Sequence, residues 1–273
     1  MSIRKAAVAG TWYSGTAEAL GEEVERHLAG AASTCDGDIV AIIAPHAGLY
    51  YSGPVAAYAY KLLTGRRYDV AVLVGPSHYV GFNGVAIYDR GAFETPLGRV
   101  PIAESCAAAI AMSSSSVREH PSAHVREHSL EMQLPFLQHV APGTPIVPLV
   151  MGYQTQETIH KLAEALAVGL AGRRALLVAS SDLSHYRDAA TAARLDGRVI
   201  EHVRAFDEAG LLKALEAYPE HACGGGPIVS VMQAARALGA RHARVLKYAD
   251  SGDVSGDKDA VVGYLAAALG TFG

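Results

Sequence analysis

The stretch that decides the fold is Asp38-Ile39-Val40-Ala41-Ile42-Ile43-Ala44-Pro45, which runs directly into His46-Ala47-Gly48. Its apolar residues are continuous rather than alternating, so the segment is predicted to be a strand that is buried on both faces. Such strands are typical of parallel sheets that are covered by helices. The sequence predicts further buried strands at 69–76, 144–150 and 175–180.

Helical patterns separate these strands. The predicted helices lie at 55–63, 103–112, 129–140, 157–171, 189–205, 207–217 and 227–238. A hairpin is predicted from 84–88 and 99–102 around the turn at 95–98. Closing strands are predicted at 245–248 and 260–267, although the second run is Ala-rich and also suits a helix. This alternation predicts an α/β fold, in which one domain over residues 1–273 has a central, mostly parallel sheet with helices on both faces.

Composition narrows the class of protein. Of 273 residues, 50% are hydrophobic and 18% are charged, which argues against intrinsic disorder. The formal net charge of −4 offers no basic excess for phosphates, so we expect no nucleic-acid partner. We also expect no membrane span, because no apolar run of about 18 residues occurs. Three cysteines make no disulfide framework, and the N-terminus lacks a secretory pattern, so a cytoplasmic protein is expected.

Histidines follow three of the predicted strands. His46 follows the first strand, His78 follows the strand at 69–76, and His185 follows the strand at 175–180 in Ser181-Asp182-Leu183-Ser184-His185. Exits of parallel strands lie at one edge of a sheet, so these side chains are expected to converge. Imidazole is a common metal ligand and a base near pH 7. A single histidine of this kind would more often be an ordinary hydrogen-bonded loop residue, but three equivalent ones favour a shared site.

Cys223 lies in His221-Ala222-Cys223-Gly224-Gly225-Gly226-Pro227, just before a predicted helix. A helix N-terminus favours the thiolate, which is the form that binds metals or attacks electrophiles. The alternative is a half-buried structural cysteine before a flexible turn. Cys35 and Cys106 are interpreted as structural.

Two further motifs carry polar or aromatic groups. In Glu127-His128-Ser129-Leu130-Glu131-Met132, a Glu-His pair and a later Glu are able to point into a cleft and contact a substrate, or simply belong to a capped amphipathic helix. Trp12 and Tyr13 lie in a Gly-bounded loop, where they would cover a substrate pocket or anchor the N-terminus to the core.

Six motifs occur together and in order. They are Gly-Thr-Trp-Tyr at 10–13, Ala-Pro-His-Ala-Gly at 44–48, Gly-Pro-Ser-His at 75–78, Glu-His-Ser-Leu-Glu-Met at 127–132, Ser-Ser-Asp-Leu-Ser-His at 180–185 and Cys-Gly-x-x-Pro-Ile at 223–228. From about residue 4 to 268 the chain closely resembles the Memo family, known in prokaryotes as AmmeMemoRadiSam system protein B. That family is similar in fold to the class III extradiol (LigB-like) dioxygenases.

The resemblance implies metal ligands at His46, His78 and Cys223, with His185 near the metal as the acid or base. In an enzyme of this kind, Asp182 would orient either His185 or the turn at Ser180-Ser181. The dioxygenase relatives have a carboxylate where this chain has Cys223, which puts catechol cleavage in doubt without excluding O₂ chemistry. The implied cofactor is one divalent or redox metal ion, with Fe(II) favoured and copper or zinc also compatible. The family name further suggests radical-SAM and AMMECR1-type proteins as partners.

Three functions compete at this point. The first is a metal-dependent oxidoreductase of extradiol-dioxygenase type that acts on a small aromatic or enediol-like molecule. The second is a non-enzymatic metal-binding adaptor that holds a peptide or protein in the same pocket. The third is zinc-type hydrolysis, since three ligands and a water are a catalytic zinc pattern. A base at His185 favours an enzyme, because an adaptor has no need of one.

Overall fold

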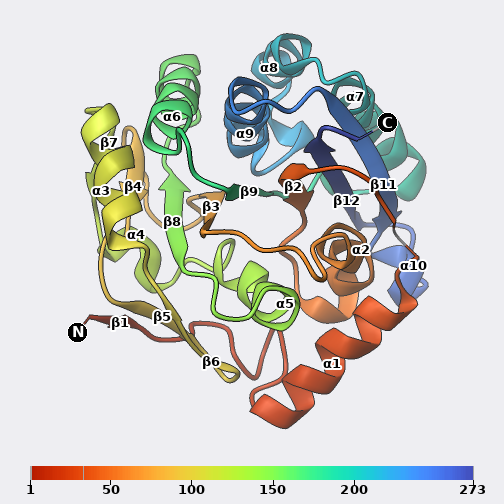
Figure 1. Ribbon diagram of the computed structural model, residues 1–273. Helices are drawn as coiled ribbons and strands as arrows, with labels where there is room; N and C mark the ends of the chain where they lie inside the picture. Colours follow the sequence, from red (N-terminus) through yellow and green to blue (C-terminus); the bar gives the residue numbers. More distant parts are fainter. Residues whose placement is uncertain (1, 33, 273) are drawn as a thin grey trace.

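A large mixed sheet forms the centre of the protein (Figure 1). The computed structural model describes residues 2–32 and 34–272. The strands on the main path of the sheet are, in spatial order, β10 (His185–Arg187), β12 (Val261–Gly270), β2 (Ile39–Ala44), β9 (Ala175–Ser180), β3 (Val70–Pro76), β8 (Ile146–Met151), β4 (Val85–Ile87) and β7 (Val117–Glu119). A ninth strand, β11 (His242–Asp250), pairs with β12.

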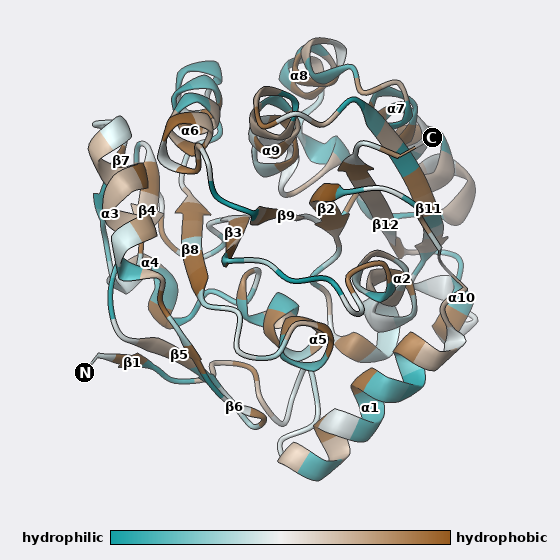
Figure 2. Cartoon of the chain, viewed as in Figure 1, coloured by the Kyte–Doolittle hydropathy of each residue, from teal (hydrophilic) through white to brown (hydrophobic). Residues whose placement is uncertain are grey.

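The middle of this sheet is parallel. Strands β2, β9, β3 and β8 pair in parallel, and the register aligns Ala44 of β2 with Ser180 of β9. Their side chains are buried almost without exception, which explains the continuous apolar runs in the sequence. Antiparallel ladders flank this parallel centre, where β12 joins β2 and where β4 joins β8. Figure 2 shows the hydrophobic strands at the centre of the molecule.

Helices cover both faces of the sheet. One face carries α3 (Glu104–Ser113), α6 (Gln156–Gly169), α9 (Gly225–Ala237), α8 (Glu208–Ala217) and α7 (Ala189–Arg204). The other carries α2 (Leu49–Lys61), α5 (Leu134–Val140) and α1 (Ala17–Gly30). Several helices begin at a side chain that caps a free backbone N–H: Thr16 caps α1, Thr155 caps α6, Asp188 caps α7 and Asp207 caps α8. The α/β class, with helices on both faces, is therefore confirmed.

The remaining elements are short. They are the three-stranded sheet of β1 (Ile3–Arg4), β5 (Ala92–Thr95) and β6 (Gly98–Pro101), the helices α4 (Ser122–Val125) and α10 (Gly252–Ser255), and the 3₁₀ turns η1 (Glu131–Gln133) and η2 (Pro219–His221). In the described part of the chain, no helix has the length and apolar character that a bilayer crossing requires.

Two local predictions differ from the structure, and one helix was missed. The predicted hairpin between 84–88 and 99–102 is wrong, because β4 enters the large sheet and β6 pairs with β5 instead. The predicted helix at 129–140 begins as the turn η1 and becomes α-helical only from Leu134. The helix α1 was not predicted, although Leu20, Val24 and Leu28 repeat at helical spacing and are buried.

Candidate metal centre

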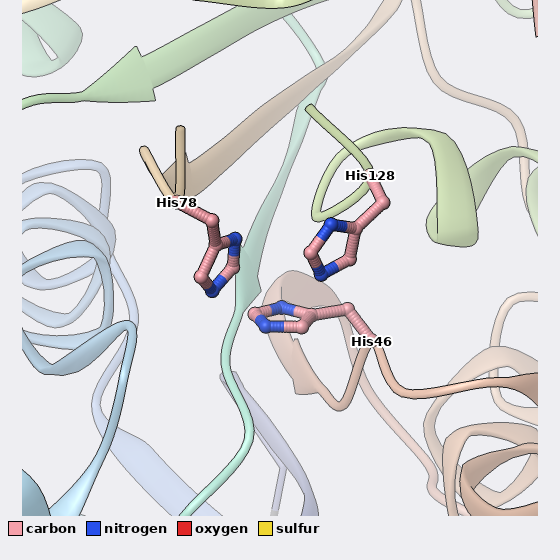
Figure 3. Close-up of side chains that lie close together, drawn as sticks. All are labelled: His46, His78 and His128. Atoms are coloured by element: carbon pink, nitrogen blue, oxygen red, sulfur yellow. The ribbon is translucent and has the colours of Figure 1, made fainter. Parts of the chain in front are cut away.

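Three imidazoles meet at the carboxyl edge of the parallel strands (Figure 3). His46 follows β2, His78 follows β3, and His128 lies in the loop before η1. The three side chains offer ring nitrogens that lie within 4.8 Å of one another. The ring centroids of His46 and His78 are 5.2 Å apart, and those of His78 and His128 are 4.5 Å apart. The group is therefore compact enough to hold a metal ion.

Hydrogen bonds determine the tautomer of His46. Its Nδ1 lies 2.8 Å from Oγ of Ser180, which the β2–β9 register places beside it. The single hydroxyl proton of Ser180 is donated to the Ser129 carbonyl at 2.7 Å, since a carbonyl only accepts. Nδ1 of His46 must therefore carry a proton and donate it to Ser180. Nε2 is left with a free lone pair that points into the cluster, as a metal ligand requires.

Gln133 supports this arrangement from behind. Its amide nitrogen donates to Oγ of Ser180 at 2.9 Å and to the Pro45 carbonyl at 3.0 Å. Its amide oxygen accepts the hydroxyl of Tyr60 at 2.8 Å. Gln133, Ser180 and Tyr60 are each fully buried, so their hydrogen bonds keep the imidazole of His46 in one orientation.

Glu127 determines the tautomer and the orientation of His78. Nδ1 of His78 lies 2.9 Å from a carboxylate oxygen of Glu127, and the backbone N–H of His78 donates to the other oxygen at 2.7 Å. Burial opposes ionisation of Glu127, but hydrogen bonds from His78 and from the Ser129 N–H outweigh it and lower the pKa of Glu127 to about 2. An ionised carboxylate only accepts hydrogen bonds. Nδ1 of His78 is therefore the protonated nitrogen, and Nε2 is free to bind a metal.

Burial keeps two of these imidazoles neutral. It lowers the pKa of His46 well below its ordinary value, and the neighbouring His78 adds to that effect. Burial also lowers the pKa of His128 to about 4, again assisted by the other imidazoles. At neutral pH, His46 and His128 are therefore unprotonated and able to bind a cation.

Cys223 lies against the same cluster. Its Sγ is 3.2 Å from Nε2 of His46, and its backbone N–H donates to the Asp182 carbonyl at 3.2 Å. Gln154 anchors the other side by donating its amide N–H to the Cys223 carbonyl at 2.7 Å. Burial, with the nearby Asp182 carboxylate, raises the pKa of the Cys223 thiol. The thiolate that a helix N-terminus was expected to favour is thus not the form that this environment favours, because burial away from water disfavours the charged form.

Asp182 and His185 follow β9 at the same edge. Asp182 is buried and accepts the backbone N–H of His46 at 2.7 Å, so one residue positions both His46 and Cys223. Burial raises the pKa of Asp182, while hydrogen bonds from the backbone of His46 and Ala47 oppose the shift. His185 opens β10 and is half-buried. A positive charge on it would lower the pKa values of both Asp182 and His46.

The two N-terminal aromatic residues have different surroundings. The ring of Trp12 lies 4.2 Å from the ring of His128, at the border of the cluster. Tyr13 is buried, and its hydroxyl donates to Glu131 at 2.6 Å. Glu131 also pairs with Arg4 and accepts the backbone N–H groups of Ala7 and Val8. The contacts of Tyr13 and Glu131 therefore match the anchoring of the N-terminal segment.

Sequence reasoning missed the residues that orient the ligands. Gln133 and Tyr60 act on His46 through Ser180, and Gln154 anchors Cys223 from a distant segment of the chain. Gln133 directly follows the motif at 127–132 and Gln154 lies shortly after β8, whereas Tyr60 lies within α2 and had no such signal. His128, which was considered for substrate contact, is also a member of the imidazole group itself.

The fold and the site together define an α/β protein with a candidate metal centre built from strand-end histidines. A family model described as Memo-like protein matches residues 4–268, and the chain belongs to this family. MEMO1 family proteins of Pyrobaculum aerophilum and Methanopyrus kandleri are 41% and 39% identical to it. The alignments cover 97% and 96% of this chain and 98% and 97% of the relatives.

A solved structure shares the fold. An uncharacterized protein from Escherichia coli K12 superposes with a TM-score of 0.53 over 84% of this chain and 99% of its own. Its sequence identity of 15% supports a statement about fold alone. The family resemblance expected from the six motifs is confirmed, while the similarity to extradiol dioxygenases stays a prediction.

Proposed function

We propose that the protein is a metal-dependent oxidoreductase of extradiol-dioxygenase type, with Fe(II) as the favoured metal and copper or zinc as compatible ones. The observation that carries the proposal is the contact between Cys223 and His46 beside His78. Two imidazoles with free Nε2 atoms and one thiol form a donor set that suits these metals. The substrate would be a small aromatic or enediol-like molecule.

The distances fit this donor set. Tetrahedral bonds of about 2.0–2.1 Å to nitrogen and about 2.3 Å to sulfur place the two ligand atoms about 3.6 Å apart. Sγ of Cys223 and Nε2 of His46 are 3.2 Å apart. Because Nε2 of His46 is unprotonated, it can only accept, and the S–H of Cys223 donates either to it or to the Asp182 carbonyl at 3.6 Å. A metal ion would take the place of that proton and would favour the thiolate despite burial.

His128 provides an alternative third ligand. Its ring belongs to the compact imidazole group, and burial keeps it neutral. In our proposal it instead contacts substrate together with Trp12, whose ring lies against it. Glu127 would influence the substrate by orienting His78, because both of its oxygens already accept hydrogen bonds from backbone and imidazole donors.

The chain's own groups supply the proton transfer. The metal would contribute redox and Lewis-acid chemistry when bound. In this proposal His185, which is half-buried at the start of β10, accepts a proton from a substrate hydroxyl. Asp182 holds the backbone of both proposed ligands and lies within electrostatic reach of His185. Ring opening by this route incorporates both atoms of O₂, so no external reductant is needed.

The test is anaerobic loading with Fe(II), followed by measurement of O₂ uptake with a panel of catechols. We expect one metal ion per chain and O₂ uptake that is lost in His46→Ala and retained in Cys106→Ala. Cys106 is buried on α3, so its variant controls for a core substitution outside the cluster. Full metal loading without O₂ uptake on any substrate would contradict the oxidoreductase and favour the adaptor.

A further inference from the structure

A cavity of about 530 Å³ opens beside the imidazole cluster. That volume suits a small organic molecule. Two lining residues connect the cavity to the cluster. The ring of Trp12 contacts the ring of His128, and Ala47 directly follows His46. Its outer wall comes from the segment after His185 and from the β12 region.

Aromatic rings dominate the lining. The five aromatic residues are Trp12, Tyr50, Tyr51, Tyr186 and Tyr264. Tyr186, Tyr50 and Tyr51 are 76%, 63% and 40% exposed, although each carries a large apolar ring. Exposed rings contribute little to the stability of the fold. An apolar surface patch around one cavity is typical of a binding site. The rings of Tyr50 and Tyr51 meet edge to face at 4.9 Å, which holds the pair in place.

The backbone at Tyr186 is strained. Its φ angle is +57°, a left-handed conformation that is strained for a bulky residue. The strain falls between the ladder pairs of His185 and Arg187 with β12, where the register shifts by a bulge. A bulge re-aims a side chain. Here it presents the Tyr186 ring to the cavity and to solvent instead of burying it.

The charged side chain that lines the cavity is negative. Among the described residues that line the cavity, Asp257 is the only Asp, Glu, Lys, Arg or His, and the others are aromatic, small or hydroxyl-bearing. Its Oδ1 accepts the backbone N–H of Asp259, and within 2–32 and 34–272 no cationic side chain pairs with it. The adjacent Lys258 is occupied by Asp250 and Asp253, each at 2.7 Å. An anionic ligand would therefore find a carboxylate and no positive partner.

We propose that this cavity binds an organic ammonium cation, of the alkylated or quaternary kind. The ring faces of Tyr and Trp carry negative potential and attract such cations, and alkyl groups on the nitrogen fill the space between rings. Asp257 adds a formal negative charge at the same cavity. The inference stands on the lining alone and does not depend on the metal or on the oxidoreductase activity.

The test compares choline with 3,3-dimethylbutan-1-ol, a neutral molecule of the same shape in which carbon replaces nitrogen. Trp12 is the only tryptophan of the chain and lines the cavity, so its fluorescence reports occupancy. Calorimetry at constant ionic strength gives an independent affinity. We expect choline to bind about tenfold more tightly than the alcohol, as cation–π attraction predicts. Equal binding of the two, or no binding of choline at millimolar concentrations, would overturn the proposal.

Variants locate the effect. Tyr50→Ala, Tyr186→Ala and Asp257→Asn should each weaken choline binding several-fold, while the alcohol is affected less by Asp257→Asn because it carries no charge. Tyr218→Ala is the control, since Tyr218 is 53% exposed but does not line this cavity. These residues are at the surface, so the variants should fold, which thermal unfolding checks. If the cavity variants bind choline as the Tyr218 variant does, the site lies elsewhere and the proposal is wrong.

Discussion

Sγ of Cys223 lies 3.2 Å from Nε2 of His46, although the two residues are 177 positions apart in the chain. The contact joins the loop before α9 to the end of β2, and Asp182 holds the backbone of both. The tautomer of His46 makes Nε2 an acceptor, so its free lone pair lies beside the sulfur of Cys223. In the proposed centre, Cys223 and His46 are therefore the ligand pair to test first.

The identity of the third ligand is open to direct test. We expect Cys223→Ala to weaken metal binding by more than the 10–100-fold that losing an outer hydrogen-bond partner typically costs. His128→Ala should retain one metal per chain. Competition with a chromophoric chelator measures both affinities. Loading with Co²⁺ adds a specific signal, since thiolate-to-cobalt charge transfer should appear in the parent protein and in His128→Ala only. The opposite pattern would assign His128 as the third ligand.

The hydroxyl of Ser180 should matter for metal affinity and not only for stability. Ser180→Ala removes the acceptor for Nδ1 of His46, which frees the ring to change tautomer. We expect metal affinity to fall by about 10–100-fold. Ser230→Ala is the matched control, because Ser230 is equally buried but donates to Ile159 on α6. Similar loss of metal affinity in both variants would show that the effect is general destabilisation.

His185 is expected to act as a base and not as a ligand. His185→Ala should keep its metal while turnover falls by about 10²–10⁴-fold, the usual contribution of a general base. Metal analysis and O₂ uptake on the same preparation separate the two roles. Loss of the metal would make His185 a ligand. Retention of both metal and full activity would move the base to another residue.

The buried pair of Arg4 and Glu131 should be a stability element. Glu131 is fully buried and accepts hydrogen bonds from the N-terminal segment, so Glu131→Gln leaves the Arg4 charge uncompensated. We expect a loss of about 3–5 kcal/mol in the free energy of unfolding, measured by urea denaturation. Glu157→Gln, which breaks an exposed pair with Lys161 on α6, should cause no measurable change.

His124 should make stability depend on pH. Burial, only partly offset by its hydrogen bond to the Ala86 carbonyl, lowers the pKa of His124 from 6.5 to about 3. As the pH falls, His124 is therefore protonated at a higher pH in the unfolded chain than in the folded protein. Its contribution to the free energy of unfolding is full above pH 6.5 and is lost as the pH falls toward 3.

Between pH 7.5 and 5, the free energy of unfolding should fall by about 2 kcal/mol more in the parent protein than in His124→Gln, where the titrating ring is absent. Urea denaturation of both proteins at the two pH values measures the difference. Equal losses in the two proteins would show that other groups cause the acid sensitivity.

Local sequence patterns were enough for the architecture and for part of the site. The continuous apolar runs at β2, β3, β8 and β9 indicated a buried parallel sheet, because only a strand covered on both faces needs apolar side chains at every position. Parallel strands end at a common edge, so the histidines after β2 and β3 could be predicted to converge. Helical spacing likewise placed most of the covering helices.

Only the tertiary structure decided which partners meet. Strand β4 could not be assigned to β8 and β7 from its own residues, because strand pairing depends on contacts distant in sequence. The protonated nitrogen of His46 depends on Ser180 and Gln133, which belong to other segments, and the aromatic cavity gathers residues from 11 to 264. Periodicity reports burial along one element, whereas tautomers, burial-shifted pKa values and cavities arise from packing between elements. That is why the ligand candidates could be found in the sequence and their chemical state could not.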